Sequence, residues 1–214
     1  MPLLDRNTNA MRLIYSTAAC SISPHIVLEE IGLPFETQRV STKEGGTRTA
    51  DYLRLNPKGK VPVLILDDGR VITENPVILQ FLARAHPDSG LLPEPLSEAF
   101  EALQVCEYFC NTVHSFGLTR LFNPRAFCVH EEHHAEIRAE GAHVVAKAFA
   151  LVAPRLEGAS FLFDRFSIAD AVLFFFEYHA RRLQLAMPPA VDLHLDRLLE
   201  RPSIRAVLAR EGLA

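Results

Sequence analysis

The feature that most constrains the fold is a change of pattern between two parts of the chain. From residue 11 to about 86, short apolar runs typical of strands alternate with helical periodicity in the order β-α-β-α-β-β-α. Two of these runs, in VPVLILDDGRVIT, flank an Asp-Asp-Gly-Arg turn, which is a hairpin signal. From residue 97 onward only helical patterns remain, separated by Asn-Pro, Gly-Ala-Ser, Pro-Pro and Arg-Pro. We therefore predict an α/β domain with a small mixed sheet, followed by an all-α domain.

The linker PDSGLLPEPLS separates these two patterns and carries three prolines, which suits a semi-rigid connection. The predicted α/β domain spans residues 11–87 and the all-α domain spans residues 97–214. Residues 1–10 are polar and unpatterned, and we expect them to form a disordered extension.

Composition excludes several classes of function. The chain has 22 basic and 26 acidic residues, a net charge of -4 and no basic stripe, so we expect no nucleic-acid partner. Its apolar runs are shorter than the ~20 residues of a membrane span and no signal peptide is recognisable, so we expect a cytoplasmic protein without a membrane partner. The four cysteines lack C-x-x-C spacing, which favours free thiols over disulfides.

The segment YSTAACSISPH places Cys20 between a strand and a helix. With Ser23 as the N-cap and Pro24 as the first helical residue, Cys20 would lie near the positive end of the helix dipole, which favours thiolate over thiol. The alternative is a buried cysteine that packs as a small apolar group, and position alone leaves both open. No second cysteine follows at C-x-x-C spacing, so disulfide exchange within the chain is not expected here.

Several motifs in the same order resemble one known family. YSTAACSISPH, NPKGKVPVLILDDG and ITENPVILQFLA are similar to the bacterial beta-class glutathione S-transferases, and RFSIADAVLF matches the family's helix-capping motif. The similarity runs from about Met11 to the C-terminus. It implies the glutathione transferase architecture, which is a thioredoxin-like N-terminal domain followed by an all-α C-terminal domain. It also implies a homodimeric detoxification enzyme that conjugates glutathione, as co-substrate, to small hydrophobic electrophiles without a metal.

The resemblance also implies a set of glutathione-binding residues. A cis Val61–Pro62 bond would turn the Val61 backbone toward the cysteinyl part of the tripeptide. Glu74 and Asn75 match the pair that binds the γ-glutamyl end, where a helix N-terminus attracts the ligand carboxylate. The predicted glutathione-binding residues are Tyr15, Lys43, Lys60, Val61, Pro62, Glu74 and Asn75. Solvated lysines, helix capping and, for Tyr15, core packing are the simpler alternatives.

The predicted catalytic residues are Cys20 and His114. His114, in NTVHSFG, matches the family histidine that points toward the sulfur, where an imidazole would stabilise a thiolate. An ordinary helix histidine is the alternative. Phe116 and Phe122 follow it and are expected to line the electrophile pocket. Two further functions remain open, namely a glutathione-dependent thiol-disulfide oxidoreductase that uses Cys20, and a binding protein that has kept the fold without catalysis.

Two further motifs concern metal binding and folding. HEEHH, from His130 to His134, satisfies H-E-x-x-H, but Ile137 and Glu140 break the longer zinc-protease pattern, so we predict no metal site. SIAD, from Ser167 to Asp170, is a capping box whose loss should cost about 1 kcal/mol.

Overall fold

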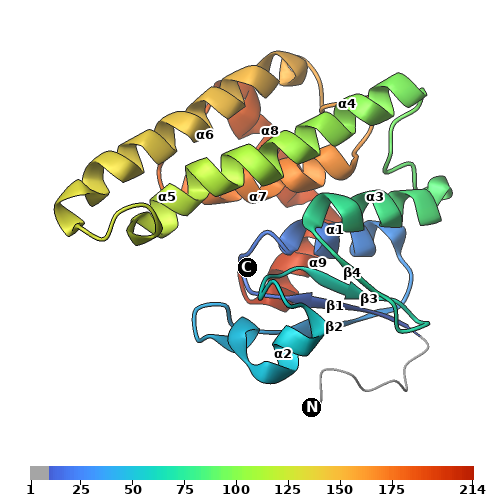
Figure 1. Cartoon of the computed structure of the whole chain (residues 1–214). Helices are drawn as coiled ribbons and strands as arrows, with labels where there is room; N and C mark the ends of the chain where they lie inside the picture. Colours follow the sequence, from blue (N-terminus) through green and yellow to red (C-terminus); the bar gives the residue numbers. More distant parts are fainter. Residues whose placement is uncertain (1–9) are drawn as a thin grey trace. The chain divides into compact units, whose positions relative to one another are not determined.

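The computed structural model describes residues 10–214, which form two compact units (Figure 1). The N-terminal unit comprises the chain up to Ser89 together with Arg201–Ala214, and the helical unit comprises Gly90–Glu200. The predicted disordered extension lies outside the described residues, except for Ala10.

A four-stranded mixed sheet forms the centre of the N-terminal unit. Its strands are β1 (Met11–Tyr15), β2 (Phe35–Arg39), β3 (Val63–Ile65) and β4 (Val71–Thr73), in the order β2-β1-β3-β4. β1 pairs with β2 in parallel, whereas the β1–β3 and β3–β4 pairs are antiparallel. Ile14 lies opposite Val63 in the β1–β3 pair. The predicted mixed sheet and thioredoxin-like fold class are therefore confirmed.

Helices cover both faces of this sheet. They are α1 (Ile22–Ile31), α2 (Ala50–Leu55), α3 (Asn75–Ala85) and α9 (Pro202–Glu211). In Figure 1, α1 and α3 lie on one face and α2 lies on the other. Tyr52 and Leu55 of α2 pack against Ile14 and Val63 of the sheet. This apolar contact holds α2 in place next to the segment that leads into β3.

The last helix belongs to the N-terminal unit, although its sequence follows the helical unit. Arg201 Nη2 pairs with Glu30 Oε2 at 2.7 Å, and Arg210 Nη1 pairs with Glu29 Oε1 at 2.7 Å. These ion pairs join α9 and its N-cap residue to the end of α1. The sequence pattern placed all of residues 97–214 in one helical domain, because periodicity does not show which surface a terminal helix covers.

The helical unit consists of α4 (Leu96–Glu107), the π-helix η3 (Tyr108–Leu118), α5 (Thr119–Phe122), α6 (His134–Leu156), α7 (Ile168–Arg182) and α8 (Pro189–Glu200). Short 3-10 turns, in both units, are η1 (Gly46–Arg48), η2 (Pro87–Ser89), η4 (Pro124–Ala126) and η5 (Glu131–His133). Phe109 lies 5.0 Å from Phe176 and 6.5 Å from Phe149 between ring centroids, and all three are fully buried or nearly so. Between residues 10 and 214, no helix combines the length and the apolar character that crossing a membrane requires.

The capping box of α7 is present as predicted, but it is part of a larger buried cluster. Asp170 Oδ2 accepts hydrogen bonds from the N–H and hydroxyl of Ser167, each at 2.8 Å. Its other oxygen accepts from the Leu162 N–H at 2.8 Å and lies 3.2 Å from His194 Nε2. His194 Nδ1 in turn lies 2.8 Å from Glu177 Oε1. Asp170, Glu177 and His194 are all fully buried, so their charges lie inside the helical unit.

Candidate functional site

Cys20 lies in the loop that joins β1 to α1. The helix begins at Ile22 with Ser21 as N-cap, so the prediction of Ser23 as N-cap is wrong. The Ser21 hydroxyl donates to the Ser16 carbonyl and accepts from the Ser16 N–H, both at 3.2 Å, instead of capping the helix. These bonds close the loop on itself and leave Cys20 directly before the N-cap.

Two other segments meet at Cys20. Its Sγ donates to the Val61 carbonyl at 3.7 Å, and the Val61–Pro62 peptide bond is cis as predicted. The Asn75 side-chain amide donates to the Cys20 carbonyl at 2.8 Å. The structure therefore brings together the cysteine loop, the cis-proline turn before β3 and the start of α3.

The thiol of Cys20 is closely surrounded by protein, although part of the residue reaches the surface. Burial disfavours the thiolate and raises the pKa of Cys20 to about 11. The backbone N–H of Cys20 and the charge of Lys60 act in the opposite direction but do not outweigh it, and the charge of Glu74 adds to the increase. Of the two alternatives that the sequence left open, the pKa favours the buried thiol, because desolvation is a larger effect than the helix start.

This pKa predicts slow and strongly pH-dependent alkylation of Cys20. Because only the thiolate reacts, the rate constant with iodoacetamide should rise about tenfold per pH unit from pH 7 to 10. Mass spectrometry of the Cys20 peptide measures this rate. Cys106, which is fully buried, serves as an internal control and should stay unmodified while the fold is intact. A plateau of the Cys20 rate below pH 9 would contradict the prediction.

Glu74 occupies the N-cap of α3 in an uncommon backbone conformation. Its φ is 73°, a left-handed value that a side chain with a Cβ rarely adopts and that is characteristic of functional sites. Its carboxylate pairs with Lys58 Nζ at 2.5 Å, and Lys58 also donates to the Thr73 hydroxyl at 2.6 Å. Lys58 was not among the predicted binding residues, although it lies within the NPKGK motif.

Asn75 is the first residue of α3 and is buried. Its side-chain nitrogen donates a hydrogen bond to the Cys20 carbonyl, and its Oδ1 has no hydrogen-bond partner among the described residues. Asn75 therefore offers a free hydrogen-bond acceptor. The first N–H groups of α3 also have no partner within the helix, which makes this helix start suited to an anion.

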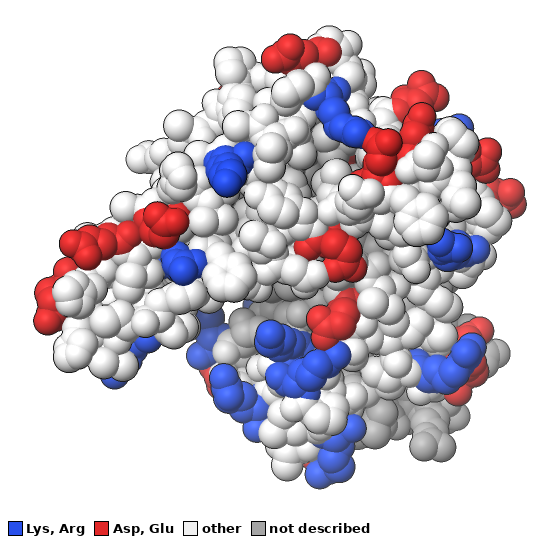
Figure 2. All heavy atoms as spheres, turned by 45° about the horizontal axis from the view of Figure 1, so that its top comes forward, with Lys and Arg blue, Asp and Glu red and all other residues white. Residues whose placement is uncertain are grey.

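The lysines predicted to bind glutathione lie at the surface. The Lys60 carbonyl accepts from the Tyr52 hydroxyl and from the Asn56 amide, both at 2.7 Å, which fixes the chain just before Val61. The side chains of Lys43 and Lys60 are exposed, and within residues 10–214 neither pairs with an acidic group. Figure 2 shows basic side chains gathered on the visible face of the N-terminal unit. Such a face suits a ligand with more carboxylates than amines.

Tyr15 and His114 belong to different units of the structure. Tyr15 is buried with its ring 5.3 Å from that of His25, and burial followed by the charge of Glu211 raises its pKa, so core packing describes it. His114 belongs to the helical unit, where its ring lies 5.6 Å from that of Phe175. A role for His114 beside Cys20 stays a prediction.

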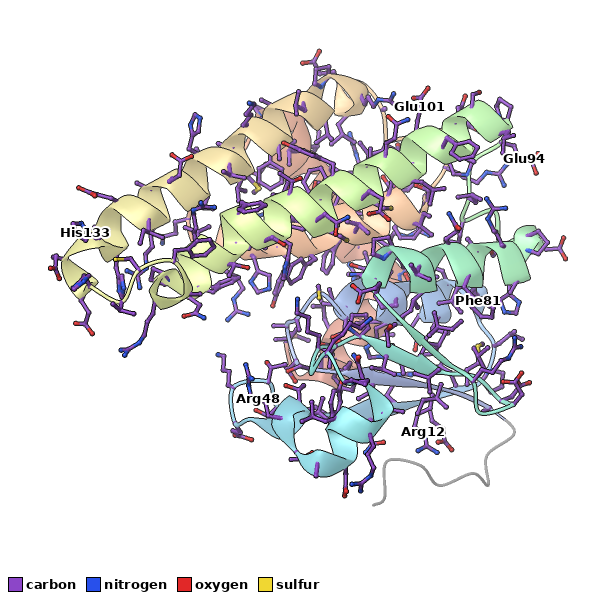
Figure 3. The ribbon with its side chains drawn as sticks, in the orientation of Figure 1. Arg12, Arg48, Phe81, Glu94, Glu101 and His133 are labelled. Atoms are coloured by element: carbon purple, nitrogen blue, oxygen red, sulfur yellow. The ribbon has the colours of Figure 1, made fainter. Side chains whose placement is uncertain are left out.

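The HEEHH segment does not form a metal centre. His130 precedes the 3-10 turn η5 and His134 begins α6, so the two histidines do not share one α-helix as the motif requires. His133 points away from the body of the helical unit (Figure 3), and His134 is hydrogen-bonded to the Cys128 carbonyl at 2.9 Å. Among the described residues, no group of three or more His, Cys, Asp or Glu side chains is placed so that it could hold a metal ion.

Comparisons with known proteins agree with this fold. The family model of the glutathione S-transferase N-terminal domain matches residues 19–85. The chain is 34% identical over 208 residues to glutathione S-transferase GstA of Escherichia coli O157:H7, covering 95% of this chain and all of that protein. Its fold resembles a sphingomonad glutathione S-transferase solved with glutathione, with TM-score 0.79, 31% identity and coverage of 95% and 100% of the two chains. A beta-class glutathione S-transferase of Sphingomonas chungbukensis gives TM-score 0.78, 29% identity and the same coverage.

Proposed function

The chain belongs to the glutathione S-transferase family, and we propose that it joins the sulfur of glutathione to small hydrophobic electrophiles. The contact of Cys20 with Val61 and Asn75 is the observation that carries this proposal. It gathers a thiol, a cis-proline turn and a helix N-terminus in one place. Val61 would pair with the cysteinyl backbone of glutathione, and the start of α3 would hold the γ-glutamyl carboxylate.

The charged residues around this place have complementary roles. Glu74 would exchange Lys58 for the ammonium group of the ligand, since both are cations of similar size. Lys43 and Lys60 would meet the ligand's carboxylates from the surface. Tyr15, which packs in the core, would support the loop that carries Cys20.

The raised pKa of Cys20 favours conjugation over disulfide exchange. A thiol with a pKa of about 11 is a hydrogen-bond donor and a poor nucleophile at neutral pH. Cys20 would donate to the glutathione sulfur as it donates to Val61 here, and His114 would add a second stabilising group. The glutathione thiol loses its proton, its sulfur bonds to the electrophilic carbon, and the leaving group departs with the bonding electrons.

The helical unit would supply the electrophile pocket, and a second copy of the chain would complete a homodimer. Phe116 and Phe122 are 50% and 51% exposed and follow His114 along the chain, so they offer apolar surface to a substrate. Val77 on α3 is 52% exposed, and Leu96 and Phe100 on α4 are 68% and 53% exposed. A partner subunit would cover such apolar side chains. A cytoplasmic location agrees with the free cysteines.

Steady-state conjugation of glutathione to 1-chloro-2,4-dinitrobenzene tests the proposal. We expect turnover by the wild type, a fall of about tenfold or more in kcat for His114→Ala, and no change for the control His143→Ala, which alters an exposed histidine of α6. Cys20→Ala should lose any glutathione-disulfide exchange while conjugation falls much less. Retention on glutathione-agarose without turnover would support a binding protein, and loss of both activities in Cys20→Ala would contradict the division of roles.

A further inference from the structure

The π-helix η3 determines which side chains of the helical unit face outward. Thr119 donates to the His114 carbonyl through its backbone N–H, a bond that spans five residues, and through its hydroxyl at 2.8 Å. Phe109, Val113 and Leu118 of η3 are buried. In an α-helix of about 3.6 residues per turn, Leu118 would lie opposite Phe109, nine residues earlier. The wider winding therefore turns Leu118 inward and leaves Phe116 half exposed.

Two glycines allow η3 and α5 to pack closely against α6. A Cβ on Gly141 would lie 2.8 Å from the Gly117 carbonyl oxygen and 2.8 Å from Arg120 Cβ. A Cβ on Gly117 would lie 2.9 Å from a methyl group of Val145. The two backbones therefore cross without room for a side chain, and the first part of Arg120 is fixed against α6.

The guanidinium of Arg120 lies between two phenylalanine rings. Its Cζ is 4.4 Å from the ring centroid of Phe127 and 5.5 Å from that of Phe116, and Nη1 donates to the Phe116 carbonyl at 2.7 Å. Phe116 is 50% exposed and Phe127 is 39% exposed. Within the described chain, no carboxylate pairs with Arg120. We call Phe116, Arg120 and Phe127 the Arg120 clamp.

We propose that the Arg120 clamp selects flat aromatic electrophiles that carry a carboxylate. A guanidinium stacked on ring faces keeps the N–H groups at its edge for an anion, and its fork matches a carboxylate in two parallel hydrogen bonds. The exposed ring of Phe116 gives the aromatic part of the substrate a surface to stack on. Because the arginine is already fixed at its stem and at Nη1, little conformational entropy is lost on binding.

This inference rests on the proposed transferase function and adds a preference between substrates. In the reaction, glutathione and the aryl chloride give the thioether, a chloride ion and a proton. The carboxylate is not consumed, so it affects binding and position alone. Arg120 is accordingly a specificity residue.

A matched pair of electrophiles tests the inference. We would measure kcat/KM for 4-chloro-3,5-dinitrobenzoate and for the neutral 1-chloro-2,4-dinitrobenzene with the wild type, Arg120→Gln and Arg120→Lys. Arg120→Gln should lower the ratio of the charged to the neutral substrate about tenfold or more, and Arg120→Lys should lower it less, since lysine keeps the charge without the fork. Arg125→Gln, which removes an exposed arginine of η4, should leave both values unchanged.

Calorimetric binding of unreactive 3,5-dinitrobenzoate and 1,3-dinitrobenzene gives a readout that does not depend on turnover. The benzoate should bind more tightly to the wild type than to Arg120→Gln, and added salt should reduce the difference. If the wild type conjugates neither electrophile but the binding of 3,5-dinitrobenzoate still depends on Arg120, the proposed transferase function is wrong and the proposed role of the Arg120 clamp is supported. An equal loss of affinity for both compounds in Arg120→Gln, or no loss for either, would contradict the proposed role of the Arg120 clamp.

Discussion

Replacing Asp170 by alanine should lower the free energy of unfolding by about 3–5 kcal/mol, because it removes one member of a fully buried charged cluster. Alanine would leave the Leu162 and Ser167 N–H groups without an acceptor and would take one carboxylate from His194. Urea unfolding at pH 7, followed by circular dichroism, measures the loss. A cap on an exposed helix would cost about 1 kcal/mol, so a loss of that size would contradict the buried role.

The same cluster gives the Asp170 variant a pH signature. Burial alone would lower the pKa of His194, but Glu177 and Asp170 outweigh it and raise the pKa to about 9 from 6.5. The stability that protonated His194 contributes is therefore complete below about pH 6.5 and is lost as the pH rises through about 9. This loss should be smaller in Asp170→Ala, which lacks one of the two carboxylates. Asp196→Ala, a control that breaks an exposed pair with Arg181, should cost less than about 1 kcal/mol and keep the pH dependence.

Local patterns in the sequence were sufficient for much of the fold. The alternation of apolar runs with turn residues predicted the four strands and their helices, because strand and helix periods differ over a few residues. The capping box at Ser167 was visible for the same reason, since its two partners are three residues apart. The family resemblance predicted the cis bond before Pro62, which local preference alone disfavours.

Features that depend on distant contacts were not predictable in this way. The π winding of η3 is tied to the close approach of Gly117 and Gly141, which are far apart in the sequence. The pKa of Cys20 depends on how much protein surrounds the sulfur, and a position before a helix gives only the smaller, opposing effect. The contact of Asp170 with His194 was not predictable either, because nothing near Asp170 in the sequence reveals His194.

Glu211, on the last helix, is a further residue that only the fold connects to the cysteine loop. Its Oε1 lies 2.9 Å from His25 Nδ1 and its Oε2 accepts from the Ala18 N–H at 3.0 Å, and both carboxylate and imidazole are fully buried. Ala18 has a φ of 55°, so its backbone needs such support to hold an uncommon conformation. Glu211→Ala should lower the free energy of unfolding by about 3 kcal/mol and raise the KM for glutathione, because the loop before Cys20 loses its anchor.

The comparison of three variants separates loop positioning from simple attachment of α9. Glu211→Gln keeps a side-chain oxygen as acceptor and should recover part of the KM for glutathione, whereas Glu211→Ala should not. Arg210→Gln breaks an ion pair of the same helix with Glu29, in which the arginine side chain is 48% exposed, and should leave that KM unchanged. If Glu211→Ala loses stability but binds glutathione as the wild type does, Glu211 anchors the helix without positioning the loop. The Ala18 contact would then have no part in forming the site, since the shape of the cysteine loop would be fixed by the Ser16–Ser21 bonds alone.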